Sequence, residues 1–429
     1  MNRRHLLAAS GAVLGAMAGC VSTAEGTRGV PSPGLQIGTD VDETAVDALV
    51  EGNTTFALRF HEAIVERDPE ENHLVSPLSI SIALAMTWAG ARGTTETEMS
   101  ETLQFPFEQD TLHLAMGGLL TALSDRAYGD DPGWFDLFTG DEDSLDLALA
   151  NRIWPQDGLA LRDEFLETLD TRYAGEPQPL DFAGDSAGAR DEINSWVADQ
   201  TNDLIDELLP AGSIDANTKL VLTNAIYLLA NWYEQFDPDD TTDEPFTSLG
   251  GATTDVPMMS QTADFPYVRE EGYQAIELPY VGEELSMVVV LPDQDGFEAF
   301  EASLTNEQLK SIFDSFTERE ISISLPQFTF ETNYSLQSVL SDLGMGSAFG
   351  AGADFSGMIE GGGLWIDDVY HDAYIAVDEE GTEAAAATGV VMTDSAPPAM
   401  RVDRPFVFLI RDRPTDAILF LGRMVKPAE

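Results

Sequence analysis

Side chains that could carry out catalysis or bind a metal are scattered along this sequence. His61-Glu62 has the start of a zinc-protease helix, but Val65 stands where the second histidine ligand would be required. The five histidines lie far apart in the chain, and no Ser-x-x-Lys pair occurs. The sequence therefore predicts no enzyme, no bound metal and no cofactor.

A run of small residues near the C-terminus favours a function that depends on a change of structure. Read with the two-residue period of a strand, Thr382, Ala384, Ala386 and Thr388 share one face, and all four are small. A strand with such a face could slide between two existing strands without a steric clash. We therefore interpret this run as a segment able to enter a β-sheet.

The elements that would position this run change in type along the chain. Amphipathic patterning begins near Val46, and the first third of the chain is mostly helical. A long helix is expected over 191–209, and Pro210 and Gly212 mark its end. Apolar strands such as 285–292 and 321–326 dominate later. The pattern indicates an α+β fold with most of its sheet toward the C-terminus.

The charge balance restricts the partners and the environment of the protein. The 76 acidic residues outnumber the 21 basic ones, which gives a net charge of -55 spread along the chain. Such like charges repel in dilute buffer, whereas at roughly 1 M salt the screening length falls to about 3 Å. We expect a halophilic protein, of the type found in haloarchaea, that binds neither nucleic acid nor anionic membranes. An acidic decoy for a basic partner is the alternative.

The N-terminus has the features of an export signal. Arg3-Arg4 precedes a short apolar stretch, Leu6 to Ala18, that is too short to span a bilayer and is typical of twin-arginine export. Met17-Ala18-Gly19-Cys20 is similar to a lipobox, in which Cys20 would be lipidated and attach the protein to the outer cell surface. We predict a signal over 1–19, a flexible tether over 20–46 and one domain over 47–429; the alternative is an ordinary signal with an incidental cysteine.

Several separate motifs resemble those of the serpin family over nearly all of residues 50–427. They are Asn72 to Ile80, then Thr223 to Tyr227 with Trp232, the run 377–392, the signature Val402 to Ile410 with Asp403, Arg404, Pro405 and Phe406, and finally Leu419 to Arg423. A departure is Leu229-Ala230-Asn231, where serpins usually carry basic residues around a glycine. The resemblance implies a large, mostly antiparallel central sheet, smaller sheets, about eight to nine helices and an exposed reactive-centre loop.

The resemblance also implies a mechanism and a role for individual residues. A target protease would cleave the loop, form an acyl-enzyme and be trapped in a covalent complex when the freed hinge enters the central sheet. Ser76, Ser79, Asn224 and His371 align with the shutter that controls how readily that sheet parts, and Trp232 with the breach where insertion begins. The implied hinge consists of Glu379, Gly381, Thr382, Glu383, Ala384, Ala385, Ala386, Ala387 and Thr388.

The scissile bond and the target protease stay open at this stage. Counting from Glu379 gives Ser395–Ala396, whereas counting back from Pro405-Phe406 gives Asp394–Ser395, which we favour slightly. Cleavage after aspartate would suit an acid-specific serine protease, and cleavage at Met392–Thr393 a subtilisin-like one. We expect a monomeric inhibitor; the alternative is a non-inhibitory serpin that is a substrate or a binding module.

Overall fold

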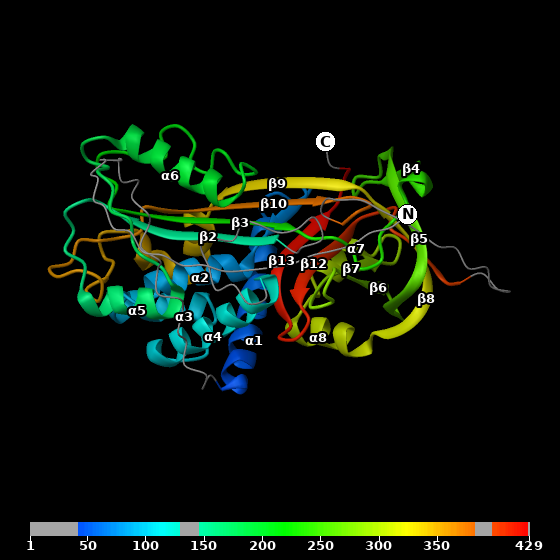
Figure 1. Ribbon diagram of the computed structural model, residues 1–429, viewed down its shortest axis with the longest axis horizontal. Helices are drawn as coiled ribbons and strands as arrows, with labels where there is room; N and C mark the ends of the chain where they lie inside the picture. The colour runs from blue at the N-terminus through cyan, green and yellow to red at the C-terminus, as the bar shows by residue number, and fades with distance from the viewer. Residues whose placement is uncertain (1–41, 129–145, 382–396, 428–429) are drawn as a thin grey trace, which may run out of the picture. The chain divides into compact units, whose positions relative to one another are not determined.

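Two β-sheets organise the part of the chain that the structure, a computed structural model, describes: residues 42–128, 146–381 and 397–427. Nine α-helices surround the sheets in these ranges (Figure 1). The helices are α1 (Glu43–Val65), α2 (Pro77–Trp88), α3 (Gly93–Thr102), α4 (Gln109–Tyr128), α5 (Asp163–Tyr173), α6 (Ser186–Gln200), α7 (Phe297–Glu301), α8 (Asn306–Ser315) and α9 (Gln337–Leu340). None of these described helices is long and apolar enough to span a bilayer.

The larger sheet has nine strands and is mostly antiparallel. Its order is β1 (His73–Val75), β13 (Ala417–Met424), β12 (Phe406–Asp412), β7 (Leu285–Pro292), β6 (Tyr273–Pro279), β5 (Thr253–Glu270), β8 (Thr317–Pro326) and β11 (Ala399–Arg401), with β4 (Thr242–Thr247) paired to β5. The strand expected over 285–292 is β7, and that expected over 321–326 lies within β8.

The smaller sheet has the order β2 (Asp146–Pro155), β3 (Leu220–Leu229), β10 (Asp368–Val377) and β9 (Phe328–Ser335). The outer pairs β2–β3 and β10–β9 are antiparallel. The central pair β3–β10 is parallel, from Asp368 opposite Val221 to Tyr374 opposite Tyr227. We call this parallel pair the seam; parallel pairing is slightly weaker per residue than antiparallel pairing.

Helix α2 supports one face of the smaller sheet. Every residue of α2 is buried, as expected for a helix that is apolar all round. It begins sharply because Pro77 occupies its first turn and the Ser76 hydroxyl caps it by accepting from the backbone N–H of Ser79 at 3.3 Å. This helix start places Ser76 and Ser79 against the smaller sheet.

Helix α6 covers the opposite face of the smaller sheet (Figure 1). The helix expected over 191–209 is wrong in its second half, because α6 ends at Gln200 and residues 201–214 continue without helical structure. Asn202 and Asp203 have φ values of 50° and 60°, a left-handed backbone that stops a helix. The buried Asn194 amide then binds the backbone N–H and C=O of Leu209 at 2.8 and 3.0 Å, which replaces the missing helical bonds.

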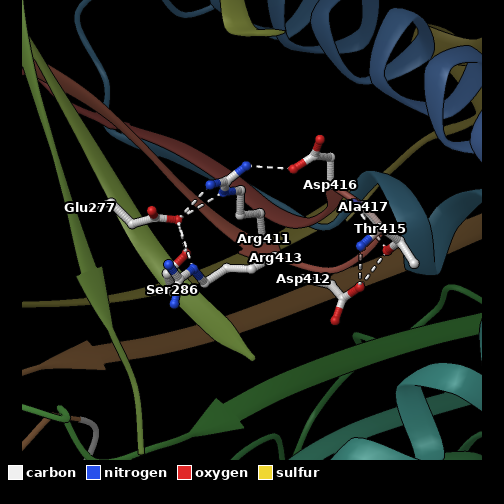
Figure 2. Close-up of polar contacts among 8 residues, drawn as sticks. All are labelled: Glu277, Ser286, Arg411, Asp412, Arg413, Thr415, Asp416 and Ala417. Carbon is white, nitrogen blue, oxygen red and sulfur yellow. Dashed lines mark hydrogen bonds and ion pairs between the residues drawn. The ribbon is translucent and has the colours of Figure 1, made fainter. Parts of the chain in front are cut away.

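A buried ion-pair network joins the inner strands of the larger sheet. Figure 2 shows the Arg411 guanidinium between the carboxylates of Glu277 and Asp416, with the Ser286 hydroxyl donating to Glu277 at 2.6 Å. Arg411 Nη2 lies 2.7 Å from Glu277 Oε1, and both side chains are almost wholly buried. Because a buried charge requires its partner, this network fixes β12 against β6 and β7.

Candidate functional site

The candidate site is the seam and the segment that leaves one of its ends. We call the end at Tyr227 of β3 and Tyr374 of β10 the upper end of the seam. Residues 378–381 follow β10 and end the described part of the chain there; residues 397–398 lead into β11. The predicted hinge residues 382–388, the candidate cleavage residues Met392, Thr393, Asp394, Ser395 and Ala396, and the lipidation residue Cys20 lie outside the described residues. The structure places the predicted shutter and breach residues and the start of the hinge at the seam, and the signature residues at the larger sheet.

Trp232, which the sequence resemblance assigns to the breach, packs at the end of the seam where β10 continues into residues 378–381. Its buried indole stacks on Tyr280, with ring centroids 4.6 Å apart and an interplanar angle of 8°. The indole Nε1 donates to the Asp378 carbonyl at 2.9 Å, and the Trp232 backbone N–H donates to the Glu380 carbonyl at 3.0 Å. The tryptophan therefore holds the chain that follows β10 against the end of β3.

Glu379 and Gly381 fix the start of the predicted hinge. The Glu379 carboxylate accepts from the Gln327 amide at 2.5 Å and from the Thr241 hydroxyl. Gly381 has a φ of 131° and forms a bridge with Asn231, and a Cβ there would lie 2.3 Å from the Ala230 carbonyl oxygen. Only glycine fits this position, because both the backbone angle and the close approach exclude a side chain.

The departure at Leu229-Ala230-Asn231 is accommodated by backbone contacts. The Asn231 carbonyl accepts from the Val281 N–H at 2.8 Å, and Asn231 pairs with Gly381 through its backbone. These bonds need no basic side chain. Sequence reasoning found Trp232, Glu379 and Gly381 but missed their partners Tyr280 and Gln327, which belong to no motif.

The four predicted shutter residues meet in one buried cluster below the middle of the seam. His371 of β10 lies directly opposite Asn224 of β3, and its Nδ1 bonds to the Asn224 side-chain oxygen. Its Nε2 accepts from the Ser76 backbone N–H at 3.1 Å. The Asn224 amide donates to the Ser79 hydroxyl. The cluster thus connects both strands of the seam to the start of α2.

The cluster extends into the neighbouring strands through two residues that sequence reasoning missed. Asn151 of β2 lies opposite Asn224 and accepts both from its amide and from the Ser79 hydroxyl, the latter at 3.2 Å. Tyr334 of β9 lies opposite His371 and bonds through its hydroxyl to His73 Nδ1 at 3.1 Å. Polar side chains at this level of the sheet therefore occur on all four strands.

Burial keeps His371 neutral. His371 is fully buried, and burial lowers its pKa to about 3 although the bond to Asn224 opposes the shift. Since Nε2 accepts a hydrogen bond, the single proton resides on Nδ1 and is donated to Asn224. The tautomer that bridges the seam is thus set by the backbone N–H of Ser76.

The signature residues hold the large sheet rather than the seam. Arg404 donates through Nε and Nη2 to the Pro292 carbonyl at 3.1 and 2.9 Å, and the Asp403 carbonyl accepts from the Thr247 N–H at 2.8 Å. Phe406 is buried against Phe328, which begins β9. Pro405 stands directly before β12. These residues anchor β12 to its surroundings.

A nucleophile pattern also occurs in the chain, at Gly184-Asp185-Ser186-Ala187-Gly188. It follows a turn, whereas a nucleophile elbow follows a strand. The Asp185 carboxylate accepts from the Gly188 N–H at 2.9 Å, so the segment is the N-cap of α6. Within the ranges that the structure describes, no three His, Cys, Asp or Glu residues are grouped so that they could hold a metal ion.

Comparisons with known proteins match most of the chain. A family model described as Serpin (serine protease inhibitor) matches residues 51–427. A serpin-like protein of Thermococcus kodakarensis is 37% identical over 429 residues, covering 96% of each chain. The leukocyte elastase inhibitor of Sus scrofa is 38% identical over 394 residues, covering 89% of this chain and 100% of its own.

Solved structures match over a similar length. Human thyroxine-binding globulin has a TM-score of 0.79 and 30% identity, covering 90% of this chain and 100% of that one. Uncleaved ovalbumin has a TM-score of 0.77 and 28% identity, covering 88% and 100%.

The neutral His371 predicts a pH dependence of stability. Its folded pKa lies below the ordinary value of 6.5, so its contribution is complete above pH 6.5 and is lost as the unfolded chain takes up a proton at lower pH. Between pH 7.5 and 5.5 this residue should cost about 1 kcal/mol of unfolding free energy. His371→Gln should reduce the pH dependence by that amount in denaturant titrations at high salt. An unaltered pH dependence in the variant would contradict this assignment.

Proposed function

Because the chain belongs to the serpin family, we propose that it inhibits serine proteases by a suicide mechanism in which its own cleaved loop enters the β3–β10 seam. The observation that carries this proposal is the position of Gly381. It lies at the upper end of the seam, bridged to Asn231 just beyond β3 and continuous with β10. The small-residue run that follows therefore starts where it would have to enter.

The seam offers a thermodynamic reason for insertion. A strand that turned back from Gly381 between β3 and β10 would run antiparallel to both of them, so one parallel ladder would be exchanged for two antiparallel ladders. About a dozen inserted residues at roughly 0.5–1.5 kcal/mol per hydrogen bond would release on the order of 10 kcal/mol. Insertion would break the direct His371–Asn224 contact, because the new strand would separate these residues.

The covalent step uses the protease's own chemistry. The protease serine would attack the carbonyl of the residue before the cut, form an ester with it and release the new amino terminus of the loop. Water would normally hydrolyse that ester. Insertion would have to be faster than hydrolysis, so that the protease is carried away from the loop's starting position and its active site distorted while still attached.

For the target protease we propose a class. We propose Asp394–Ser395 as the scissile bond, with Ser395–Ala396 and Met392–Thr393 as the alternatives, and accordingly an acid-specific or a subtilisin-like serine protease. Mass spectrometry of the cleaved loop identifies the bond directly. A relative that is 38% identical is named as an inhibitor of leukocyte elastase, which supports inhibition in general.

A non-inhibitory role is the second candidate. One matched structure is a thyroxine-binding globulin complexed with its ligand, so this fold can also bind small molecules. Such a protein, or one that is merely a substrate, would be cleaved without trapping the protease.

The net charge and the N-terminus support a proposed location. We propose a halophilic protein that is exported by the twin-arginine route and held at the cell surface through lipidated Cys20. Cys20→Ser should then release the protein from the membrane fraction into the medium at unchanged salt. Retention of the variant in the membrane fraction would exclude lipidation as the anchor.

Trapping should depend on the small inner face of the loop. Thr382→Arg would place an unpaired charge inside the sheet, at a cost of several kcal/mol, so complex formation should fall more than tenfold while cleavage continues. The measurement is the amount of protease complex that survives boiling in detergent, per loop cleaved.

Glu383→Arg is the matched control, because the next residue of a strand faces the other side of the sheet. This control should trap protease at close to the natural yield. Equal trapping by Thr382→Arg and the natural chain would overturn the proposed mechanism, and cleavage of the natural chain with full protease activity would favour the non-inhibitory role.

A further inference from the structure

Residues 201–214, which we call the strap, cross the smaller sheet on the face opposite α2. The Asn202 amide donates to the Tyr227 hydroxyl of β3 at 2.9 Å. The Asn333 amide of β9 donates to the Leu208 carbonyl at 3.0 Å, and the Tyr370 hydroxyl of β10 donates to the Ser213 carbonyl at 3.3 Å. Because the strap is bonded to strands on both sides of the seam, the seam cannot widen on this face until some of these bonds break.

Asp372 lies in the sheet beside the strap's attachment to β9. It follows His371 in β10, so its side chain points to the strap face rather than toward α2. It is 1% exposed, and its Oδ2 accepts from the same Asn333 amide that binds Leu208, at 3.1 Å. Its Oδ1 has no hydrogen-bond partner among the described residues. One amide thus connects a buried carboxyl group to the strap.

The surroundings of Asp372 disfavour a negative charge. Its strand neighbours are Ala225 of β3 and Asn333 of β9, and the nearby charged group is the Glu331 carboxylate, also of β9. Burial, assisted by Glu331, raises the pKa of Asp372 to about 7, although the Asn333 amide opposes the rise.

No ion pair joins Asp372 to a basic side chain among the described residues; of the basic groups on this face, Arg152 of β2 lies over the Trp196 ring and Arg190 of α6 pairs with Glu207 of the strap at 3.7 Å. On the same face, β10 carries Tyr370 and Tyr374, and β3 carries Tyr227. The strap itself contributes acidic groups with exposed side chains, Asp203, Asp206 and Glu207. The Oδ1 atom of an ionised Asp372 has no hydrogen-bond partner among the described residues, so its charge would gain hydration when the strap lifts.

We propose that Asp372 is a positioning residue whose ionisation releases the strap and so sets how fast the seam opens for the loop. In its neutral form the carboxyl group is tolerated beneath the strap. In its ionised form it is incompletely hydrogen-bonded, and the lifted strap becomes more populated because water then hydrates the charge. The consequence for protease trapping rests on the proposed function; the release of the strap does not.

Hydrogen exchange of the strap amides in the intact full-length protein tests the release. Wild type and Asp372→Asn are compared at pH 5.5 and pH 8.0 in the same high-salt buffer, and the ratio of their rates cancels the effect of pH on the chemistry of exchange. If the pKa of Asp372 falls by one unit when the strap lifts, ionisation of Asp372 increases the population with a lifted strap about tenfold. The expected ratio is therefore about 1 at pH 5.5 and about 10 at pH 8.0.

Two controls separate this effect from a general loss of stability. Amides of the buried strand β7 should show no such change, and Asp206→Asn, which removes an exposed strap carboxylate, should exchange like the wild type. A ratio for Asp372→Asn that is the same at both pH values overturns the proposal. Should that variant fail to fold, Glu331→Gln tests it instead: the pH at which strap exchange accelerates should fall, and an unmoved transition overturns the proposal.

Protease trapping provides the readout that involves function. The measured quantity is the number of inhibitor molecules consumed per protease trapped. The ratio of this number for Asp372→Asn to that for the wild type should rise between pH 5.5 and pH 8.0, because the seam of the variant still opens slowly at the higher pH. If strap exchange responds as expected but no complex forms at any pH, the strap mechanism holds and the proposed inhibitory function fails.

Discussion

The parallel pairing of β3 with β10 is the constraint on which the rest of the structure depends. Among the described strands of the smaller sheet it is the one parallel pair, whereas the pairs on either side are antiparallel. Under the proposed mechanism, the seam must stay closed in the intact chain and must open after cleavage. A sheet that opened too easily would accept the uncleaved loop, and one that opened too slowly would let the protease escape.

Three groups of contacts hold the seam closed from different directions. At its upper end Trp232 and Glu379 fix the chain that follows β10. On the α2 face, His371 and Asn224 bridge the two strands through a neutral, fully buried hydrogen bond. On the opposite face the strap spans both strands. Each contact contributes on the order of 1 kcal/mol, so the stability of the closed state depends on their number rather than on any single contact.

The sequence allowed the serpin fold to be predicted because its motifs are local, and the family model and the matched structures confirm that prediction. Motif residues such as Ser76 and Asn224 were found in this way. Their partners Asn151, Tyr280 and Gln327 could not be found, since they meet the site only through strand pairing and stacking. The helix over 191–209 was predicted too long because its apolar spacing continues past Gln200, whereas the left-handed backbone at Asn202 ends it. Asp372 has no sequence signal, because its burial depends on the strap.

The most direct test of loop entry is the thermal unfolding of the protein before and after a single cut in the loop, in the same high-salt buffer. Two new antiparallel ladders should raise the unfolding temperature of the cleaved protein by at least about 10 °C. Equal unfolding temperatures for the cut and uncut chains would mean that the seam does not accept the loop, and would contradict the account.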